Sequence, residues 1–328
     1  MKAAFIKKTG PPCNIEYGEL PIPKIKDNEV LIKVSAVAVN PIDTYIRSGK
    51  YTFSQALPTP FIIGCDAVGV VADFGSAVKQ FKAGQRVWTN RMGLNGLQGT
   101  YAEYVAVDED LVYSAPEHVD DVALVSVLQS GATACIGLIR AAMLKVSEIV
   151  FINGGAGNVG SAIIQLAVAR GARVITATSG NEKMEWCKSL GAELVLDYKK
   201  DDFSKKIEMV APDGVDVFWD TSRNPNFEIS IPLMKQHGRI VLMAGHDAHP
   251  TLPVGLFYSK ECTLKGFSLV NANHLELKGC AEIINRCLED GKLKTKISEV
   301  MPLSEASRAH SIIESQPELW GKIVLKIS

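Results

Sequence analysis

The sequence predicts an α/β protein in which a β-rich domain is interrupted by a doubly wound parallel sheet. Its first part, to about residue 120, holds short apolar runs among frequent turn signals such as Pro58-Thr59-Pro60, a pattern that favours β-structure. From about residue 149, apolar runs of strand length alternate with helical patterns, which is typical of a parallel sheet covered on both faces. A last apolar run at 321–327 would complete the β-rich domain and make the parallel sheet an insertion within it.

Each predicted element rests on its own apolar pattern. In the first part, apolar runs bounded by turn residues predict strands at 30–39, 68–72 and 85–88. In the middle part, they predict strands at 149–153, 173–179, 193–198, 215–221 and 239–244. Helical patterns between these strands predict helices at 159–170, 182–190 and 226–237, the last two ending before glycines. In the last part we expect a strand at 263–269, a helix at 273–290 and a strand at 321–327.

The composition is that of an ordinary globular protein, and its 328 residues suffice for two domains. The net charge of -1 gives no broad attraction to nucleic acid or to an anionic membrane. No stretch approaches the roughly 18 apolar residues of a membrane-spanning helix, and the N-terminus lacks the apolar core of a signal peptide. Seven scattered cysteines without a C-x-x-C pair indicate reduced thiols, so we expect a cytoplasmic protein.

A glycine-rich turn follows the first strand of the middle part. Gly155, Gly157 and Gly160 have the spacing G-x-G-x-x-G between that strand and the next helix. In this setting the first glycine makes a tight turn, the second leaves room for a pyrophosphate, and the third lets helix and strand pack closely. The N–H groups of the first helical turn, which contains Asn158 and Val159, would face the phosphates. The motif therefore predicts a Rossmann-type dinucleotide site.

The end of the second strand selects the cofactor. A site for NAD usually carries a carboxylate there to accept from the ribose 2′-hydroxyl, whereas this strand ends at Ser179-Gly180. Ser179 is a small donor and Lys183 lies one turn into the next helix, which suits a 2′-phosphate. Glu182 argues for NAD, but Ser179 and Glu182 have the spacing of a capping box, in which Glu182 folds back onto the helix start. We therefore favour NADPH over NADH; the alternative for Lys183 is a lysine that merely faces solvent.

Several segments resemble the medium-chain dehydrogenase/reductase superfamily, and in particular its zinc-free branch, the NADPH:quinone oxidoreductases related to ζ-crystallin. The most specific is the first, because an asparagine followed by Pro and Asp marks that branch. Together they cover nearly the whole chain. They are Val39 to Gly49, Gly64 to Gly69, Gly99 to Tyr104, Gly131 to Ala134, the glycine-rich turn, and Gly321 to Leu325.

The resemblance implies a GroES-like catalytic domain made of residues 1–122 and 266–328, with a Rossmann NADPH-binding domain, residues 123–265, inserted between them. It also implies a cofactor in the cleft between the domains and a homodimer or homotetramer, often formed by joining edge strands of the Rossmann sheets. Beyond the glycine-rich turn, it implies three groups of residues at the cofactor. They are Asn40, Tyr45 and Thr133 near the nicotinamide, Phe267 and Leu269 on a strand passing it, and Ser179, Lys183 and Tyr198 around the ribose phosphate.

Zinc-dependent relatives bind their catalytic metal through a Cys, a His in a Gly-His-Glu motif, and a later Cys. Here Val39-Asn40 and Gly64-Cys65-Asp66 stand at the first two positions. A catalytic zinc site needs three protein ligands, so we expect no metal. His246 and His249 lie three apart in a predicted loop, where a polar surface loop is the alternative to a metal site.

Hydride transfer places negative charge on an acceptor oxygen, and without a metal that charge must be stabilised otherwise. Hydrogen-bond donors can stabilise it, and quinones or α,β-unsaturated carbonyls delocalise it themselves. Candidate donors are Asn40, Tyr45 and Tyr51; the alternatives are that Asn40 fixes the turn before Pro41 and that Tyr51 forms an apolar wall. We therefore expect an NADPH-dependent reductase of quinones or related conjugated carbonyls. An alkenal or enone double-bond reductase and a non-enzymatic NADPH-binding structural protein are the alternatives.

Overall fold

The computed structural model describes residues 1–51, 56–200, 202–316 and 318–327, apart from the side chain of Ser204. The chain forms two compact units: Met1–Gln129 with Asn273–Ser328, and Ser130–Ala272. These boundaries lie later than those predicted after residues 122 and 265. The reason is that helix α2 (Asp121–Ile136) runs across the first boundary, and strand β14 (Thr263–Gly266) still pairs within the sheet of the second unit.

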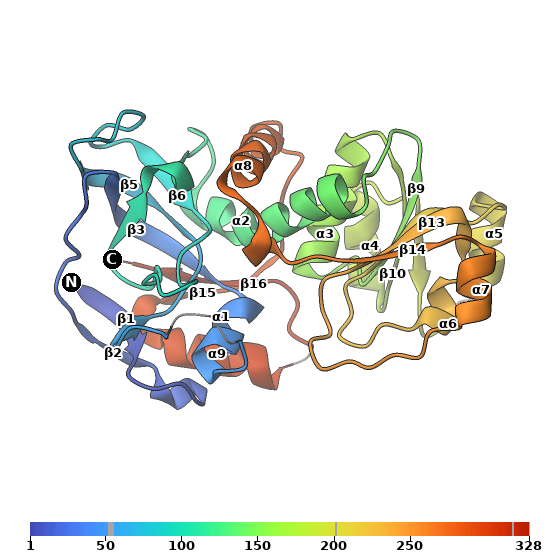
Figure 1. Ribbon diagram of the computed structural model, residues 1–328, viewed down its shortest axis with the longest axis horizontal. Helices are drawn as coiled ribbons and strands as arrows, with labels where there is room; N and C mark the ends of the chain where they lie inside the picture. Colours follow the sequence, from blue (N-terminus) through green and yellow to red (C-terminus); the bar gives the residue numbers. More distant parts are fainter. Residues whose placement is uncertain (52–55, 201, 317, 328) are drawn as a thin grey trace. The chain divides into compact units, whose positions relative to one another are not determined.

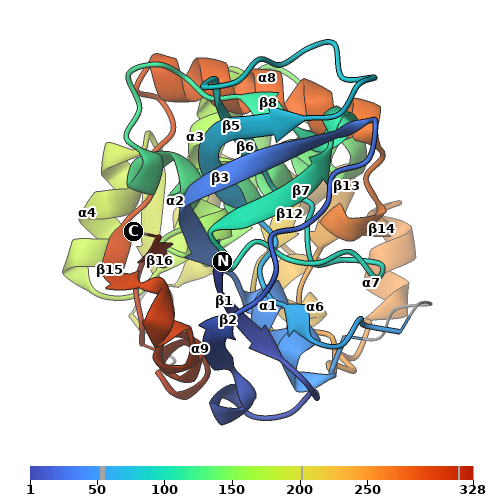
Figure 2. The same ribbon diagram turned by 90° about the vertical axis from the view of Figure 1, so that its left-hand side faces the viewer.

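The first unit is built around strand β3 (Glu29–Val39), whose apolar side chains are largely buried. It pairs antiparallel with β5 (Ala67–Phe74) and β7 (Tyr104–Asp108) along its earlier part and with β16 (Lys322–Lys326) near its end (Figure 2). The pairing of β16 with β3 confirms that the two ends of the chain build one β-rich domain. The other elements are β1 (Lys2–Ile6), β2 (Glu16–Glu19), α1 (Pro41–Ser48), β4 (Phe61–Ile62), β6 (Arg86–Thr89), β8 (Tyr113–Ser114), α8 (His274–Glu289), β15 (Ile297–Pro302) and α9 (Ala306–Ser315).

The second unit is the predicted doubly wound sheet, with its described strands in the order β11-β10-β9-β12-β13-β14. Every described pair in it is parallel, which confirms the Rossmann-type fold. Its strands are β9 (Ile149–Asn153), β10 (Arg173–Thr178), β11 (Leu194–Asp197), β12 (Val215–Asp220), β13 (Met234–Leu242) and β14. Its helices are α3 (Asn158–Ala169), α4 (Asn181–Ser189), α5 (Phe203–Val210), α6 (Phe227–Ser230) and α7 (Val254–Ser259).

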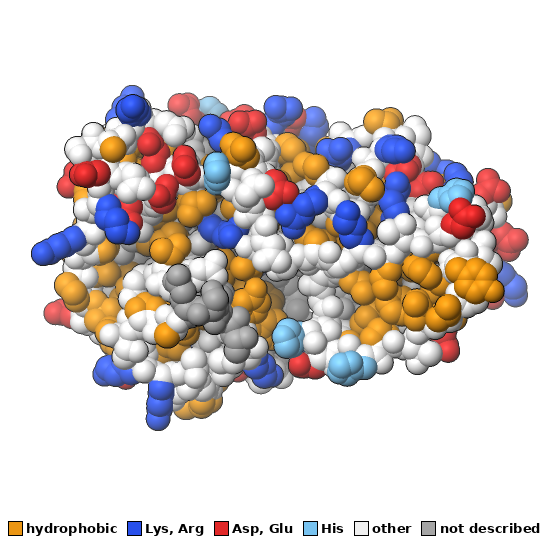
Figure 3. All heavy atoms as spheres, viewed as in Figure 1, with side chains coloured by type: hydrophobic (Ala, Val, Ile, Leu, Met, Phe, Trp, Pro, Cys, Tyr) orange, Lys and Arg blue, Asp and Glu red, His pale blue; other side chains and the backbone are white. Residues whose placement is uncertain are grey.

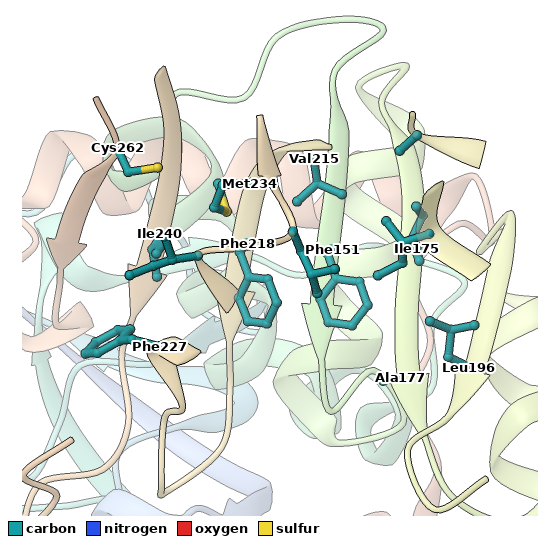
Figure 4. Close-up of a cluster of buried hydrophobic side chains, with 14 residues drawn as sticks. Phe151, Ile175, Ala177, Leu196, Val215, Phe218, Phe227, Met234, Ile240 and Cys262 are labelled. Atoms are coloured by element: carbon teal, nitrogen blue, oxygen red, sulfur yellow. The ribbon is translucent and has the colours of Figure 1, made fainter. Parts of the chain in front are cut away.

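One face of this sheet carries a buried apolar cluster (Figure 4). Phe151 on β9 and Phe218 on β12 stack with ring centroids 4.8 Å apart, and Ile240 on β13 extends the cluster. Helices α5 and α6 cover it with Ile207 and Phe227. The cluster fixes the strands rigidly, so the turns at their carboxyl ends are held in defined positions.

The helix predicted at 226–237 is wrong for most of its length. Helix α6 ends at Ser230, and β13 already begins at Met234 instead of at residue 239. Pro232 stands between them; a proline has no N–H to continue the helical hydrogen bonds, and its ring clashes with the carbonyl group four residues earlier. His237, at φ 60°, then lies in an irregular stretch of β13 that the apolar pattern does not reveal.

Helix α2 continues into a π-helical turn, Gly137–Ala141. The combined helix, Asp121–Ala141, is long and apolar enough to cross a membrane by length and composition. The expectation that no segment is long and apolar enough to span a membrane is therefore wrong. Polar residues such as Gln129 interrupt the apolar residues of this helix, but the helix as a whole stays apolar. Of its most apolar window, 78% is buried inside the structure, as in the core helix of a globular protein.

Candidate functional site

The glycine-rich turn joins β9 to α3 at the carboxyl edge of the parallel sheet (Figure 1). Gly157 directly precedes α3, and no side chain caps the start of this helix. The first N–H groups of a helix have no partner within the helix and carry partial positive charge. The start of α3 is therefore suited to an anionic group such as a diphosphate.

The three glycines of the motif have different surroundings. A Cβ on Gly155 would lie 2.9 Å from Cβ of Thr176 on β10, and a Cβ on Gly160 would lie 2.8 Å from Cα of Gly155. Both glycines are thus needed for packing inside the protein. Gly157 is exposed, and a Cβ there would meet only a carbonyl oxygen, at an ordinary 3.4 Å. The described residues give no reason for a glycine at that position, which fits a residue kept small for a ligand.

Ser179 and Tyr198 lie just after neighbouring strands, β10 and β11. The Ser179 Oγ donates to the Tyr198 hydroxyl over 2.9 Å, and the Tyr198 side chain is 55% exposed. Lys183, half-buried, lies in the first turn of α4. The structure thus brings Ser179 and Tyr198 together at the sheet edge, with Lys183 one helical turn away along the chain.

The predicted capping box of Ser179 and Glu182 is wrong. Helix α4 begins at Asn181, and no side chain caps its start. Gly180 adopts a left-handed φ of 86°, so the helix begins after it and not at Ser179. The Ser179 side chain therefore forms its hydrogen bond with Tyr198 instead of capping the helix. The reason for discounting Glu182 as a ribose ligand therefore falls away, and the preference for NADPH rests on Ser179 and Lys183.

The strand order fixes the direction in which a dinucleotide would run. From β9 the sheet continues through β10 and β11 on one side and through β12, β13 and β14 on the other. Ligands of doubly wound sheets bind outside the carboxyl ends of the strands. If Ser179 and Tyr198 mark the adenosine side, the nicotinamide extends over the ends of β12 to β14.

Phe267 and Leu269 lie on that second side, although not on a strand as predicted. Strand β14 ends at Gly266, and Leu269 begins a 3-10 turn, Leu269–Asn271. Thr133 lies on α2, half-buried, within the part of that helix that belongs to the second unit.

Asn40 is enclosed in the first unit, with only 1% of its surface exposed. Its Nδ2 donates to Oδ2 of Asp66 over 2.9 Å, and its Oδ1 accepts from Nζ of Lys322 over 2.7 Å. Its backbone N–H donates to Oδ2 of Asp43 in the first turn of α1. These bonds fix the turn before Pro41. To donate to an acceptor as predicted, the Asn40 side chain would have to exchange one of them.

Asn40 belongs to a buried polar cluster with Asp43, Asp66, Tyr101 and Lys322. Burial raises the pKa of Asp66 to about 7 and that of Asp43 to about 6, the latter against hydrogen bonds that include the Tyr101 hydroxyl. Burial also lowers the pKa of Lys322, while the two carboxylates act in the opposite direction. One ammonium thus faces two acids in a site closed to solvent.

Tyr45 and Tyr51 are both half-buried, and the backbone N–H of Tyr51 donates to the carbonyl of Tyr45 over 3.1 Å. Both belong to the first unit, whereas the glycine-rich turn and Phe267 belong to the second. That the two tyrosines, the glycine-rich turn and Phe267 line one cleft stays a prediction.

Sequence reasoning missed two features. Lys322 entered only as part of a family segment, because a lysine at the start of an apolar run is ordinarily exposed, whereas this one is buried. The buried ring of Trp219 next to Phe267 had no signal in the sequence beyond an aromatic residue near a strand end.

Within the described ranges, no group of three or more His, Cys, Asp or Glu side chains is arranged to hold a metal ion. His246 lies on the surface, and its Nδ1 is 2.9 Å from a carboxylate oxygen of Asp247.

Two family profiles match the chain. One, described as the alcohol dehydrogenase GroES-like domain, matches residues 26–117. The other, described as zinc-binding dehydrogenase, matches residues 158–286. The two matches fall on the β-rich part and on the parallel sheet, respectively.

Curated and solved proteins are similar over the full length. Quinone oxidoreductase of Sus scrofa is 34% identical, with 99% of this chain and 97% of that protein covered. The chloroplastic NADPH-dependent alkenal/one oxidoreductase of Arabidopsis thaliana is 33% identical, with 93% and 73% covered. The structure of Escherichia coli quinone oxidoreductase complexed with NADPH has a TM-score of 0.85 and 25% identity, with 99% and 100% covered.

Proposed function

Because the chain belongs to the quinone oxidoreductase family of medium-chain dehydrogenases/reductases, we propose that it transfers hydride from NADPH to quinones or related conjugated carbonyl compounds. The observation that carries the proposal is the turn between β9 and α3. There α3 begins directly after the exposed Gly157, which has no side chain to cap the helix, the arrangement that receives a dinucleotide pyrophosphate.

In this proposal the second unit holds the cofactor along the carboxyl edge of its sheet. The start of α3 binds the pyrophosphate, and Ser179, Lys183 and Tyr198 surround the 2′-phosphate. Phe267 and Leu269 pass the nicotinamide. When bound, NADPH supplies a hydride from its reduced nicotinamide ring. A similar protein, the quinone oxidoreductase of Escherichia coli, is known in complex with NADPH, which supports this choice of cofactor.

On the acceptor side, the candidate donors in the first unit are the hydroxyls of the half-buried Tyr45 and Tyr51. They would stabilise the oxygen that gains charge as hydride arrives. Asn40 acts mainly by fixing the start of α1, because its amide is already bonded to Asp66 and Lys322. A quinone spreads the developing charge over its own ring, so this modest set of donors suffices.

The test follows the absorbance of NADPH with and without an ortho-naphthoquinone. We expect oxidation that requires the quinone and persists after treatment with EDTA, because the proposed reaction needs no zinc. Full loss of activity in EDTA, restored by added zinc, would reject the metal-free mechanism. Absence of NADPH binding in calorimetry would reject the cofactor site itself.

Reduction of alkenal double bonds is the second candidate. It is favoured by the similarity to the Arabidopsis alkenal/one oxidoreductase. Comparing kcat/KM for the ortho-naphthoquinone with that for a medium-chain alkenal separates the two activities.

We also propose that two copies pair through the edge strand of the parallel sheet. All four residues of β14 are exposed, and β14 has one neighbour, β13, among the described strands. Apolar side chains gather over the adjoining α7, where Val254 and Tyr258 are 60% and 70% exposed (Figure 3). A sheet edge can pair with its own copy across a two-fold axis, which would cover both features.

We propose a cytoplasmic location, which the scattered cysteines without a C-x-x-C pair support.

A further inference from the structure

An aromatic contact lies next to the segment that follows β14. Trp219, near the end of β12, is fully buried, and its ring meets that of Phe267 edge-on, with centroids 5.6 Å apart and planes at 83°. Both rings also press against Gly137. A Cβ on Gly137 would lie 2.5 Å from Cζ2 of Trp219 and 2.6 Å from Cζ of Phe267. Three residues from separate segments thus share one contact that leaves no room for a methyl group.

Gly137 begins the π-helical turn that ends the apolar helix α2. Such turns are frequent at functional sites. The same turn carries Arg140, whose Nη2 donates to the carbonyl oxygen of Ser268 over 3.3 Å. The backbone N–H of Phe267 donates to the carbonyl of Leu242 on β13 over 3.1 Å. The chain at Phe267 and Ser268 is therefore held by the packing of the Phe267 ring and by these two hydrogen bonds.

We propose that Trp219 and Gly137 are positioning residues for the nicotinamide end of the cofactor, which they place by fixing Phe267 and Ser268. The inference rests on the proposed function, because it takes the dinucleotide to run along the edge toward β14. Trp219 has no exposed surface, so it acts through Phe267 and not by touching the ligand. Thr133 lies four residues before Gly137 on the same helix face. A shift of Gly137 against the rings of Trp219 and Phe267 would therefore also change the distance from Thr133 to Phe267.

The test compares two ligands that share the adenosine half. NADPH carries the nicotinamide ring, whereas 2′-phospho-ADP-ribose lacks it. For Trp219→Leu we expect the Kd of NADPH to rise on the order of tenfold and kcat with a quinone to fall roughly 10–100-fold, the scale of a small misplacement of bound groups. The Kd of 2′-phospho-ADP-ribose should change less than about twofold, because the ribose and pyrophosphate sites are untouched. Trp219→Phe, which keeps an aromatic face toward Phe267, should recover much of the loss.

Phe218→Leu is the matched control. Phe218 is the neighbouring buried aromatic residue on β12 and packs into the cluster on the opposite face of the sheet. It should lower stability without changing the ratio of the two Kd values. Should Trp219→Leu fail to fold, Gly137→Ala gives the same comparison, because its added methyl group would push both rings aside.

Equal weakening of both ligands in Trp219→Leu and Gly137→Ala, or no change in either Kd, would overturn the inference. If the unaltered protein bound neither ligand, the proposed function itself would fail. Retained binding of 2′-phospho-ADP-ribose therefore separates an error in this inference from an error in the cofactor assignment.

Discussion

The ammonium of Lys322 faces the carboxyl groups of Asp43 and Asp66 in a site without solvent. Removing one partner of a buried charge cluster typically costs about 3–5 kcal/mol, so Lys322→Met should lower the free energy of unfolding by about that much near neutral pH. Urea unfolding measures it. Lys326→Met, on the exposed end of the same strand, is the control and should change little.

The loss in Lys322→Met should also depend on pH. Burial raises the pKa of both carboxyl groups above their ordinary values, so the folded state favours their neutral forms. Such groups cost the fold stability as the pH rises through their folded pKa values, and the cost disappears as they take up protons. The deficit should thus be smaller at about pH 5 than at about pH 8. An equal deficit at both would show that the ammonium does not serve to neutralise these acids.

Lys183 is the residue that distinguishes the two nicotinamide cofactors in our proposal. A hydrogen bond to a charged group contributes about 1.5–3 kcal/mol, so Lys183→Ala should raise the KM for NADPH by about tenfold or more. The KM for NADH should stay nearly constant, because NADH has no 2′-phosphate. Lys188→Ala on the same helix, where the ammonium pairs with Glu185, is the control. A parallel rise for both cofactors would place Lys183 outside the ribose phosphate site.

The turn between β9 and α3 contains two kinds of glycine. We propose that Gly157 is kept small for a ligand, whereas Gly160 is required for packing inside the protein. Gly157→Ala should leave the Tm of the protein nearly unchanged but abolish the rise in Tm expected from NADPH, because the methyl group meets only a carbonyl oxygen at an ordinary distance and lies where we propose that the pyrophosphate binds. Gly160→Ala should lower the Tm itself, because its Cβ meets the Gly155 backbone at 2.8 Å. Differential scanning fluorimetry with and without NADPH distinguishes these outcomes. Similar losses of Tm in both variants would contradict the assignment.

The strands and helices show how much of this fold can be predicted from the sequence. Strands β9 and β10 lie within one residue of their predicted ends, because buried parallel strands are continuous apolar runs. Helix α6 was predicted too long, because the apolar pattern around Pro232 fits a helix and a buried strand equally well. The bond between Asn40 and Lys322 joins residues 282 positions apart, and no local pattern reports such a contact. The glycine-rich turn was recognisable because its chemistry is contained in a few consecutive residues.

For the whole molecule, the decisive question is whether two copies join at β14. A double variant, Tyr258→Glu with Leu264→Glu, places charges on the exposed apolar surface of α7 and β14. Light scattering should then report the mass of one chain, 35.5 kDa, whereas we expect twice that value for the unaltered protein. Leu275→Glu, on a leucine of α8 that is more exposed than Leu264, should leave the mass unchanged. A variant that kept the larger mass would place the interface elsewhere.

The pairing of β16 with β3 has a consequence for how the chain is made. Ribosomes release β3 long before its partner strand is translated, whereas Ser130–Ala272 emerges as an uninterrupted block. The nucleotide-binding half can therefore fold during translation, while the other half waits for its final strand. A premature stop codon after Ala272 would yield a product with a finished parallel sheet, a β3 that lacks its pairing with β16, and an Asn40 without Lys322 as its hydrogen-bond partner. Such a product would be a ready target for chaperones and proteases.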